Sequence, residues 1–240
     1  MIVDNINNGS ASNVNHSFPK NKLLEKVIES IKSTPINFKK AISEEEKPTF
    51  NEDELTLLFA NQNQVQINKL GIPVRVGEQY RDIYHKTKGI PDLHYSVLEE
   101  GVNYEPIFIM EAKRLPAPTI TREKEYVIGK TPSGNPNGGI ERFKLENHGK
   151  GLNECGMLGY IEKDDFNAWL SKINDWILEL IPNWSKKETL NFEFSNQEQA
   201  YLSSIVIRSN SSLKLHHFWI DLYGHIKTPN REKTLRQSYE

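Results

Sequence analysis

The chain has 240 residues, 37% of them hydrophobic and 26% charged, and a formal net charge of −2. This length allows one sizeable core, or a core with a small addition. The charge argues against a general polyanion binder but is compatible with a local basic surface.

Cysteine content and the N-terminus point to a compartment. The single cysteine, Cys155, excludes an intrachain disulfide framework and a cysteine-rich zinc site, and it fits a reducing cytoplasm. The Asn-rich N-terminus lacks the basic and apolar regions of a signal peptide, and the apolar runs are too short to span a membrane. We therefore expect a cytoplasmic protein without a membrane partner.

Three regions are expected along the chain. Residues 1–48 should form a loose Asn- and Ser-rich segment, one helix and a linker. Apolar residues at helical spacing predict the helix over residues 23–31, and three glutamates with a proline predict the linker over residues 41–49. The main domain is expected over residues 49–225, followed by a basic tail over residues 226–240.

The main domain is predicted to open with a helix and three strands. Asn51 is a favourable N-cap residue, so the helix should begin directly after it. Residues 73–84 mix β-branched, aromatic and charged side chains, as a half-exposed strand does. Residues 89–97 and 107–113 are predicted to be the next two strands, joined by a polar turn.

A long loop, two helices and four strands are expected in the rest of the domain. Residues 115–139 hold four prolines and four glycines, which predicts an irregular segment. One helix should begin at Gly139, and helical spacing predicts another over residues 166–181. Strands are expected over residues 157–161, 189–194, 201–208 and 213–222, with the last two paired as a C-terminal β-hairpin.

Three ionisable residues stand near the ends of adjacent predicted strands. Asp92 lies near the start of one strand, while Glu111 and Lys113 follow the apolar run Ile107-Phe-Ile-Met110, which is typical of a buried strand. Because side chains alternate along a strand, Glu111 and Lys113 point the same way. Two carboxylates can hold a hard divalent cation, and a lysine beside them can face an attacking water or a phosphate.

Pro91-Asp92 followed by Glu111-Ala112-Lys113 resembles the active-site signature of the PD-(D/E)xK nuclease superfamily. A second Glu-x-Lys, Glu45-Glu-Lys47, lies in a polar stretch with no predicted strand. The resemblance implies a restriction-endonuclease-like fold of the α/β (α+β) class, with a central mixed β-sheet flanked by helices. Its core order is helix, three antiparallel strands, helix, strand, which the C-terminal β-hairpin would extend.

The resemblance also implies a role for each residue of the signature. Asp92, Glu111 and the main-chain carbonyl of Ala112 would bind Mg²⁺, with Mn²⁺ as a substitute. The metal would polarise the phosphoryl oxygen and make a bound water more acidic. Lys113, in its charged form, would orient that water or offset charge in the transition state.

The resemblance suggests a further metal ligand from the helix before the sheet. Glu52 and Glu54 lie in the first turn of that predicted helix. Glu52 lies slightly closer to the helix face formed by the apolar residues at positions 55, 58 and 59, so it is the better candidate. A structural interpretation remains open for both acids, because carboxylates favour the positive end of the helix dipole.

The helix that should begin at Gly139 supplies the candidate substrate-binding residues, because the resembled superfamily often places a polar or basic residue there. These candidates are Arg142, Lys144 and His148. Arg142 could bind a phosphate or pair with Glu146 one turn later.

His216 and His217 are neighbours on a predicted strand, so they face opposite sides and are unsuited to bind one metal together. One is expected in the core and the other exposed.

We therefore expect a Mg²⁺-dependent nuclease that hydrolyses phosphodiester bonds in DNA. Its type would be a restriction or phage-defence endonuclease, acting as a homodimer or with a partner subunit of a defence system. Three alternatives are open: a DNA-binding or scaffold protein of the same fold without catalysis, an RNA-directed or repair nuclease, and an unrelated α/β domain with Glu111–Lys113 as a surface pair.

Overall fold

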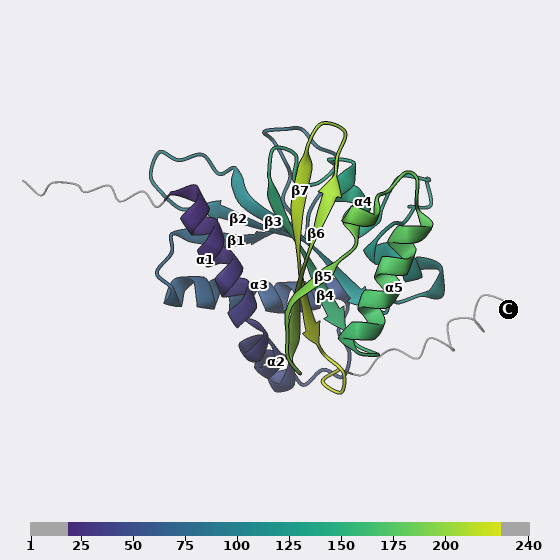
Figure 1. Cartoon of the computed structure of the whole chain (residues 1–240). Coiled ribbons are helices and arrows are strands. Elements are labelled where there is room, and N and C mark those ends of the chain that lie inside the picture. Colours follow the sequence, from purple (N-terminus) through teal and green to yellow (C-terminus); the bar gives the residue numbers. More distant parts are fainter. Residues whose placement is uncertain (1–18, 227–240) are drawn as a thin grey trace, which may run out of the picture.

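One mixed sheet of seven strands organises residues 19–226, the part of the chain that the computed structural model describes (Figure 1). The strand order is β1-β2-β3-β4-β7-β6-β5. The strands are β1 (Val74–Glu78), β2 (Leu93–Val97), β3 (Pro106–Leu115), β4 (Glu154–Ile161), β5 (Asn191–Ser195), β6 (Gln199–Ile207) and β7 (Ser212–Asp221). The helices are α1 (Lys20–Ser33), α2 (Pro35–Glu44), α3 (Glu52–Lys69), α4 (Gly139–Lys144) and α5 (Phe166–Glu179), with short 3₁₀ helices η1 (Ile120–Tyr126) and η2 (Lys186–Glu188).

The centre of the sheet is parallel and its two margins are antiparallel. β1, β2 and β3 pair antiparallel, whereas β4 runs parallel to both β3 and β7. A parallel pair needs a crossover connection, and residues 116–153, which contain η1 and α4, provide it between β3 and β4. β7, β6 and β5 then pair antiparallel.

Helices cover both faces of the sheet, so its central strands are buried on both sides (Figure 1). One apolar cluster joins α1, α2 and α3 to one face, and a second joins α4 and α5 to the other. Strand β3 shows the alternation: Phe108 and Met110 belong to the first cluster and Ile109 to the second. Glu111 therefore points to the α4 side of the sheet.

The N-terminal helices differ from the sequence prediction. Helix α2 was not predicted, and it extends to Glu44, inside the expected linker. Its Phe38 packs edge-on against Phe59 of α3, with ring centroids 5.6 Å apart, so α2 joins the same apolar cluster as the sheet. The expected loose segment over residues 1–18 and nearly all of the expected basic tail lie outside the described residues.

The predicted strands and the other helices are present, with shifted ends. Strand β1 is shorter than predicted and ends at Glu78, because the next residue, Gln79, has a φ of 50°. The predicted hairpin is formed by β6 and β7. Among residues 19–226, no helix combines the length and apolar content that crossing a membrane requires.

The expectation that either His216 or His217 is exposed was wrong, because β7 lies between β4 and β6 with both faces covered. Both side chains are buried. They do face opposite sides: His216 contacts Glu154 at 2.7 Å, and His217 contacts the Tyr126 hydroxyl at 2.9 Å.

Candidate active site

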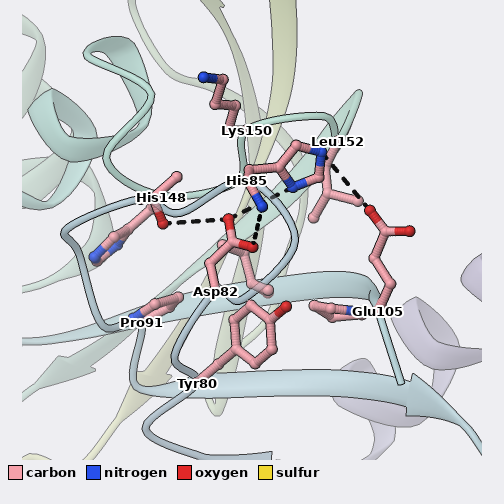
Figure 2. A pocket seen from close by; sticks show the side chains of 12 residues that line it. Tyr80, Asp82, His85, Pro91, Glu105, His148, Lys150 and Leu152 are labelled. Atoms are coloured by element: carbon pink, nitrogen blue, oxygen red, sulfur yellow. Dashed lines mark hydrogen bonds and ion pairs between the residues drawn. The ribbon is translucent and has the colours of Figure 1, made fainter. Parts of the chain in front are cut away.

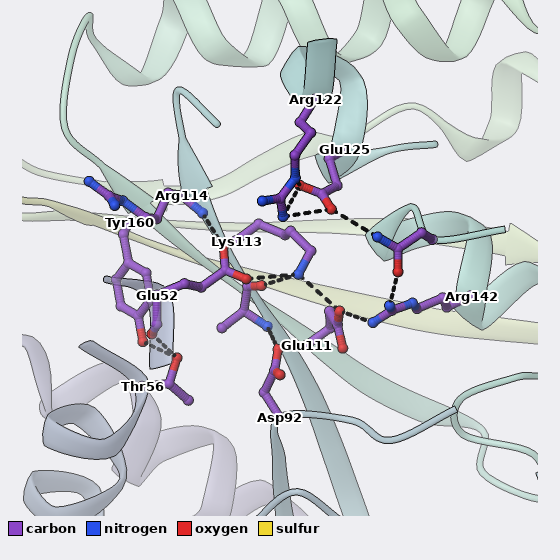
Figure 3. A network of polar contacts seen from close by, with 12 residues as sticks. Glu52, Thr56, Asp92, Glu111, Lys113, Arg114, Arg122, Glu125, Arg142 and Tyr160 are labelled. Atoms are coloured by element: carbon purple, nitrogen blue, oxygen red, sulfur yellow. Dashed lines mark hydrogen bonds and ion pairs between the residues drawn. The ribbon is translucent and has the colours of Figure 1, made fainter. Parts of the chain in front are cut away.

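The three residues of the predicted signature meet beside one short stretch of β3, which carries two of them (Figure 3). Asp92 lies just before β2, and its Oδ2 accepts a hydrogen bond of 2.7 Å from the Ala112 N–H. The Lys113 ammonium lies 3.0 Å from Glu111 Oε1. Antiparallel pairing of Leu93 with Met110 sets this meeting, because it places the residue before β2 beside the polar end of β3.

Oxygen atoms surround the ammonium of Lys113. Its Nζ lies 2.7 Å from the Ala112 carbonyl oxygen, 3.0 Å from Glu111 Oε1 and 3.1 Å from Glu52 Oε1. These are three of the four groups that the sequence nominated as metal ligands. The oxygens of these three predicted metal ligands therefore already surround one positive charge, the ammonium of Lys113.

The first turn of α3 decides between the two candidate glutamates. Glu54 forms a capping box with Asn51, in which each main-chain N–H donates to the other side chain at 2.8 Å, and it also pairs with Lys47. Glu52 instead reaches the signature, where its second oxygen accepts a 3.1 Å hydrogen bond from the Arg114 N–H. Only the Glu52 carboxylate of this pair therefore borders the site.

Glu111 is held ionised in a fully buried position. Its exposed fraction is 0%, and it contacts the ammonium of Lys113 and the guanidinium of Arg142. Burial alone would raise the pKa of Glu111, but the charges of Lys113 and Arg142 hold it below the usual value. Burial likewise acts to lower the pKa of Lys113, and Glu111 and Glu52 raise it overall. Lys113 is thus a cation and is unsuited to act as a general base.

Asp92 behaves differently from its neighbour. Burial, followed by the nearby charge of Glu111, raises the pKa of Asp92 to about 8. The carboxyl therefore keeps its proton at neutral pH, and a nearby cation would favour its ionised form. Two acids with opposed pKa shifts side by side are typical of a functional site.

His148 is the third residue that contacts Glu111. Its Nδ1 lies 3.4 Å from Glu111 Oε2, and burial lowers the pKa of His148 to about 4, so the ring is neutral. His148 was predicted to bind substrate. In the structure it is buried and contacts Glu111, a predicted metal ligand.

The other two substrate-binding candidates occupy different places. Arg142 reaches Glu111 and Asn137; the alternative pairing with Glu146 does not form among the described residues, because α4 has ended and Glu146 has a φ of 55°. Lys144 points away from Arg142, and its ammonium is held by Glu188 at 2.8 Å and by the Ile207 carbonyl at 2.9 Å. The substrate contact of Lys144 stays a prediction, and in the structure its ammonium contacts η2 and β6 rather than Glu111.

A polar chain that the sequence did not reveal continues outward from Arg142 (Figure 3). Asn137 accepts from Arg142 and donates to Glu125 at 3.1 Å, and Glu125 binds Arg122 through two hydrogen bonds of 2.8 Å. Asn137 lies in the loop of prolines and glycines, where no periodic pattern marks one polar residue over another.

The site opens beside Arg142. A cavity of about 580 Å³ lies there, and its charged lining residues, Lys88 and Arg142, are both basic. The side chains of Glu52 and Arg142 retain 23% and 22% of their exposure, whereas Lys113 and Glu111 are buried. The alternative of a surface pair on an edge strand is wrong, because β3 is central and Glu111 is fully enclosed.

The carboxylate and carbonyl oxygens of the site are the types of ligand that bind a divalent cation, but they are not arranged around one. Within residues 19–226, no three His, Cys, Asp or Glu side chains form a ready metal-binding group. Lys113 and Arg142 engage Glu111 Oε1, while Glu111 Oε2 is buried without a hydrogen-bond partner. Glu111 Oε2 therefore has no hydrogen-bond partner in the described part of the chain, and the oxygens of Glu52, Glu111 and Ala112 already surround the Lys113 ammonium. This arrangement fits a metal ion that would partly displace the ammonium of Lys113.

Comparisons with family models, curated proteins and solved structures gave no match to this chain.

Proposed function

We propose that this protein is a metal-dependent nuclease that hydrolyses phosphodiester bonds in DNA. One observation carries the proposal: Glu52, Glu111 and the Ala112 carbonyl gather around the Lys113 ammonium, next to the Asp92 carboxyl that accepts a hydrogen bond from the Ala112 N–H. The cavity beside Arg142 adds a basic approach for a phosphate.

The residues that would hold Mg²⁺ or Mn²⁺ are Asp92, Glu111, Glu52 and the carbonyl of Ala112. When bound, the cation supplies positive charge to a phosphoryl oxygen and increases the acidity of water. Lys113 remains charged and offsets negative charge that develops on the oxygens of the reacting phosphate. Arg142, which lines the cavity, orients a phosphate from the open side.

The element order supports the same proposal. α3 precedes three antiparallel strands, and α4 with a parallel β4 follows, which is the order expected for the resembled restriction-endonuclease-like core. β5, β6 and β7 extend the sheet beyond the strands that carry the site. These additional strands offer a surface that could recognise DNA. We therefore propose a restriction or phage-defence endonuclease that works with a second copy or another subunit.

The test is cleavage of supercoiled plasmid, single-stranded DNA and RNA with Mg²⁺ or Mn²⁺ and with EDTA. Lys113→Ala and Asp92→Ala should abolish metal-dependent cutting. Lys40→Ala is the matched control, because Lys40 lies on α2 with a side chain 76% exposed. Cutting that survives EDTA or both site variants contradicts the proposal, and cutting of RNA alone redirects it to an RNA nuclease.

A second candidate is a DNA-binding or scaffold protein without catalysis. It is favoured by the fact that Lys113 and Arg142 already neutralise Glu111, so the network is balanced without a metal. The same assay separates the two, since a scaffold binds DNA but leaves it uncut with every metal.

A further inference from the structure

Two side chains at the floor of the site face each other through unpaired polar atoms. Glu111 Oε2 and both ring nitrogens of His148 are buried without a hydrogen-bond partner among the described residues. The only other atom in this condition there is the Tyr80 hydroxyl. Buried polar groups are normally paired, so a cluster of orphaned atoms marks a place for a species that binds them.

The His148 ring is fixed in place from two directions. Phe143 of α4 meets it edge-on, with centroids 5.6 Å apart and an interplanar angle of 82°. Gly89 also lies against the ring, since an added Cβ there would come within 2.4 Å of His148 Nε2. Nε2 therefore faces the backbone at Gly89, and Nδ1 is left to face Glu111.

A small cavity bounds the histidine on a further side. It is about 20 Å³ in volume, and Tyr80, Asp82, His85 and Glu105 also line it (Figure 2). In that group the His85 ring lies between Asp82 and Glu105, at 3.5 Å and 3.8 Å. His85 thus has its own acidic partners, whereas His148 does not share them.

The separation of the two orphaned atoms carries chemical information. His148 Nδ1 and Glu111 Oε2 are 3.4 Å apart, which is long for a hydrogen bond between them. It equals the spacing expected between two ligands of one cation, about 3 to 3.5 Å for metal–ligand bonds of about 2.1 Å. A histidine ring nitrogen without a hydrogen-bond partner can offer its lone pair to a metal.

We propose that His148 is a ligand of the metal at this site, binding through Nδ1 beside Glu111 Oε2. The inference rests on the proposed metal-dependent function and deepens it by naming a nitrogen in the coordination set. Imidazole nitrogen suits transition metals, whereas carboxylate and carbonyl oxygen also suit Mg²⁺. The mixed set therefore favours Mn²⁺ over Mg²⁺.

The experiment measures the metal itself, not activity. Mn²⁺ is titrated into the full chain by electron paramagnetic resonance, and pulsed spectra are recorded for ¹⁴N coupling at the bound ion. We expect one Mn²⁺ per chain, a histidine nitrogen coupling, and binding about tenfold tighter for Mn²⁺ than for Mg²⁺. His148→Gln should remove the coupling and most of the preference, because it offers an oxygen in place of nitrogen.

Two controls keep the result interpretable. His85→Gln alters a histidine on the same small cavity that has other partners, and it should leave the coupling intact. Uniform ¹⁵N-histidine labelling of the unaltered chain should convert the ¹⁴N coupling into a ¹⁵N coupling, which needs no variant to fold.

The outcomes separate this inference from the proposed function. If Mn²⁺ binds and DNA is cut but no histidine nitrogen couples, or if the coupling survives in His148→Gln, the ligand assignment is overturned and the nuclease proposal stands. If neither metal binds to the unaltered chain, both fail together. Loss of the coupling in His148→Gln alone supports the assignment.

Discussion

Replacement of Asp92 by Asn should change how the stability of the protein depends on pH. The pKa of Asp92 rises from 3.8 to about 8 on folding, mainly through burial. A carboxyl with a raised pKa contributes its full stability below the unfolded pKa of 3.8, and this contribution falls as pH rises until it is lost above about 8. Asn has the same shape, carries no charge at any pH, and can accept the same hydrogen bond from Ala112.

The magnitude follows from the two pKa values. The full rise in the pKa of Asp92, from 3.8 to about 8, corresponds to at most about 6 kcal/mol of unfolding free energy, at about 1.4 kcal/mol per pH unit. Between pH 6 and pH 9 the folded protein loses its proton while the unfolded chain is already ionised. Linkage then predicts a loss of about 2.5 kcal/mol in the unfolding free energy of the wild type relative to Asp92→Asn.

Urea denaturation in EDTA at pH 6, 7, 8 and 9 measures this difference for both proteins. Between pH 6 and pH 9 the unfolding free energy of the wild type should fall by about 2.5 kcal/mol relative to the variant, with most of the fall complete by pH 8. Added Mn²⁺ should restore part of the wild-type stability at pH 9, because a bound cation favours the ionised carboxyl. Parallel pH profiles for the two proteins would refute the assignment of a protonated Asp92 next to Glu111.

Three further predictions concern the network and the core. Lys113→Ala should lower the unfolding free energy by about 3 kcal/mol in urea denaturation, because it leaves Glu52 and Glu111 short of a buried cation, whereas Lys40→Ala should change it by less than about 0.5 kcal/mol. Arg142→Ala should weaken binding of a short DNA duplex about tenfold by fluorescence anisotropy, with Lys144→Ala unchanged at the same salt, since Lys144 is held by Glu188. Phe38→Ala should cost about 3 to 5 kcal/mol, because the ring is fully buried against α3; a cost below about 1 kcal/mol would mean that α2 is not part of the core.

The signature strand was predictable because its chemistry is local. An apolar run followed by Glu111 and Lys113 marks a buried strand with a polar end, and alternation gives the shared direction of the two side chains. The choice of Glu52 over Glu54 was also within reach of the helix geometry, and Glu52 does border the site. The proximity of Asp92 followed from hairpin spacing.

The remaining features depend on long-range packing. Helix α2 is short and has an exposed Ile36, so its stability comes from Phe38 and Ile42 packed against other elements, which no local pattern reveals. The partners of Arg142 depend on how α4 crosses β3. Likewise, the burial of both His216 and His217 depends on which strands and helices flank β7.

The position of Glu52 ties the N-terminal region to the chemistry. Glu52 is the first residue of α3, and α3 shares one apolar cluster with α1 and α2. Trimming the chain at the expected domain start, residue 49, would expose the flank of α3 and free its first turn to shift. Helices α1 and α2, which precede the expected main domain in the sequence, therefore help to hold the Glu52 carboxylate at the candidate site.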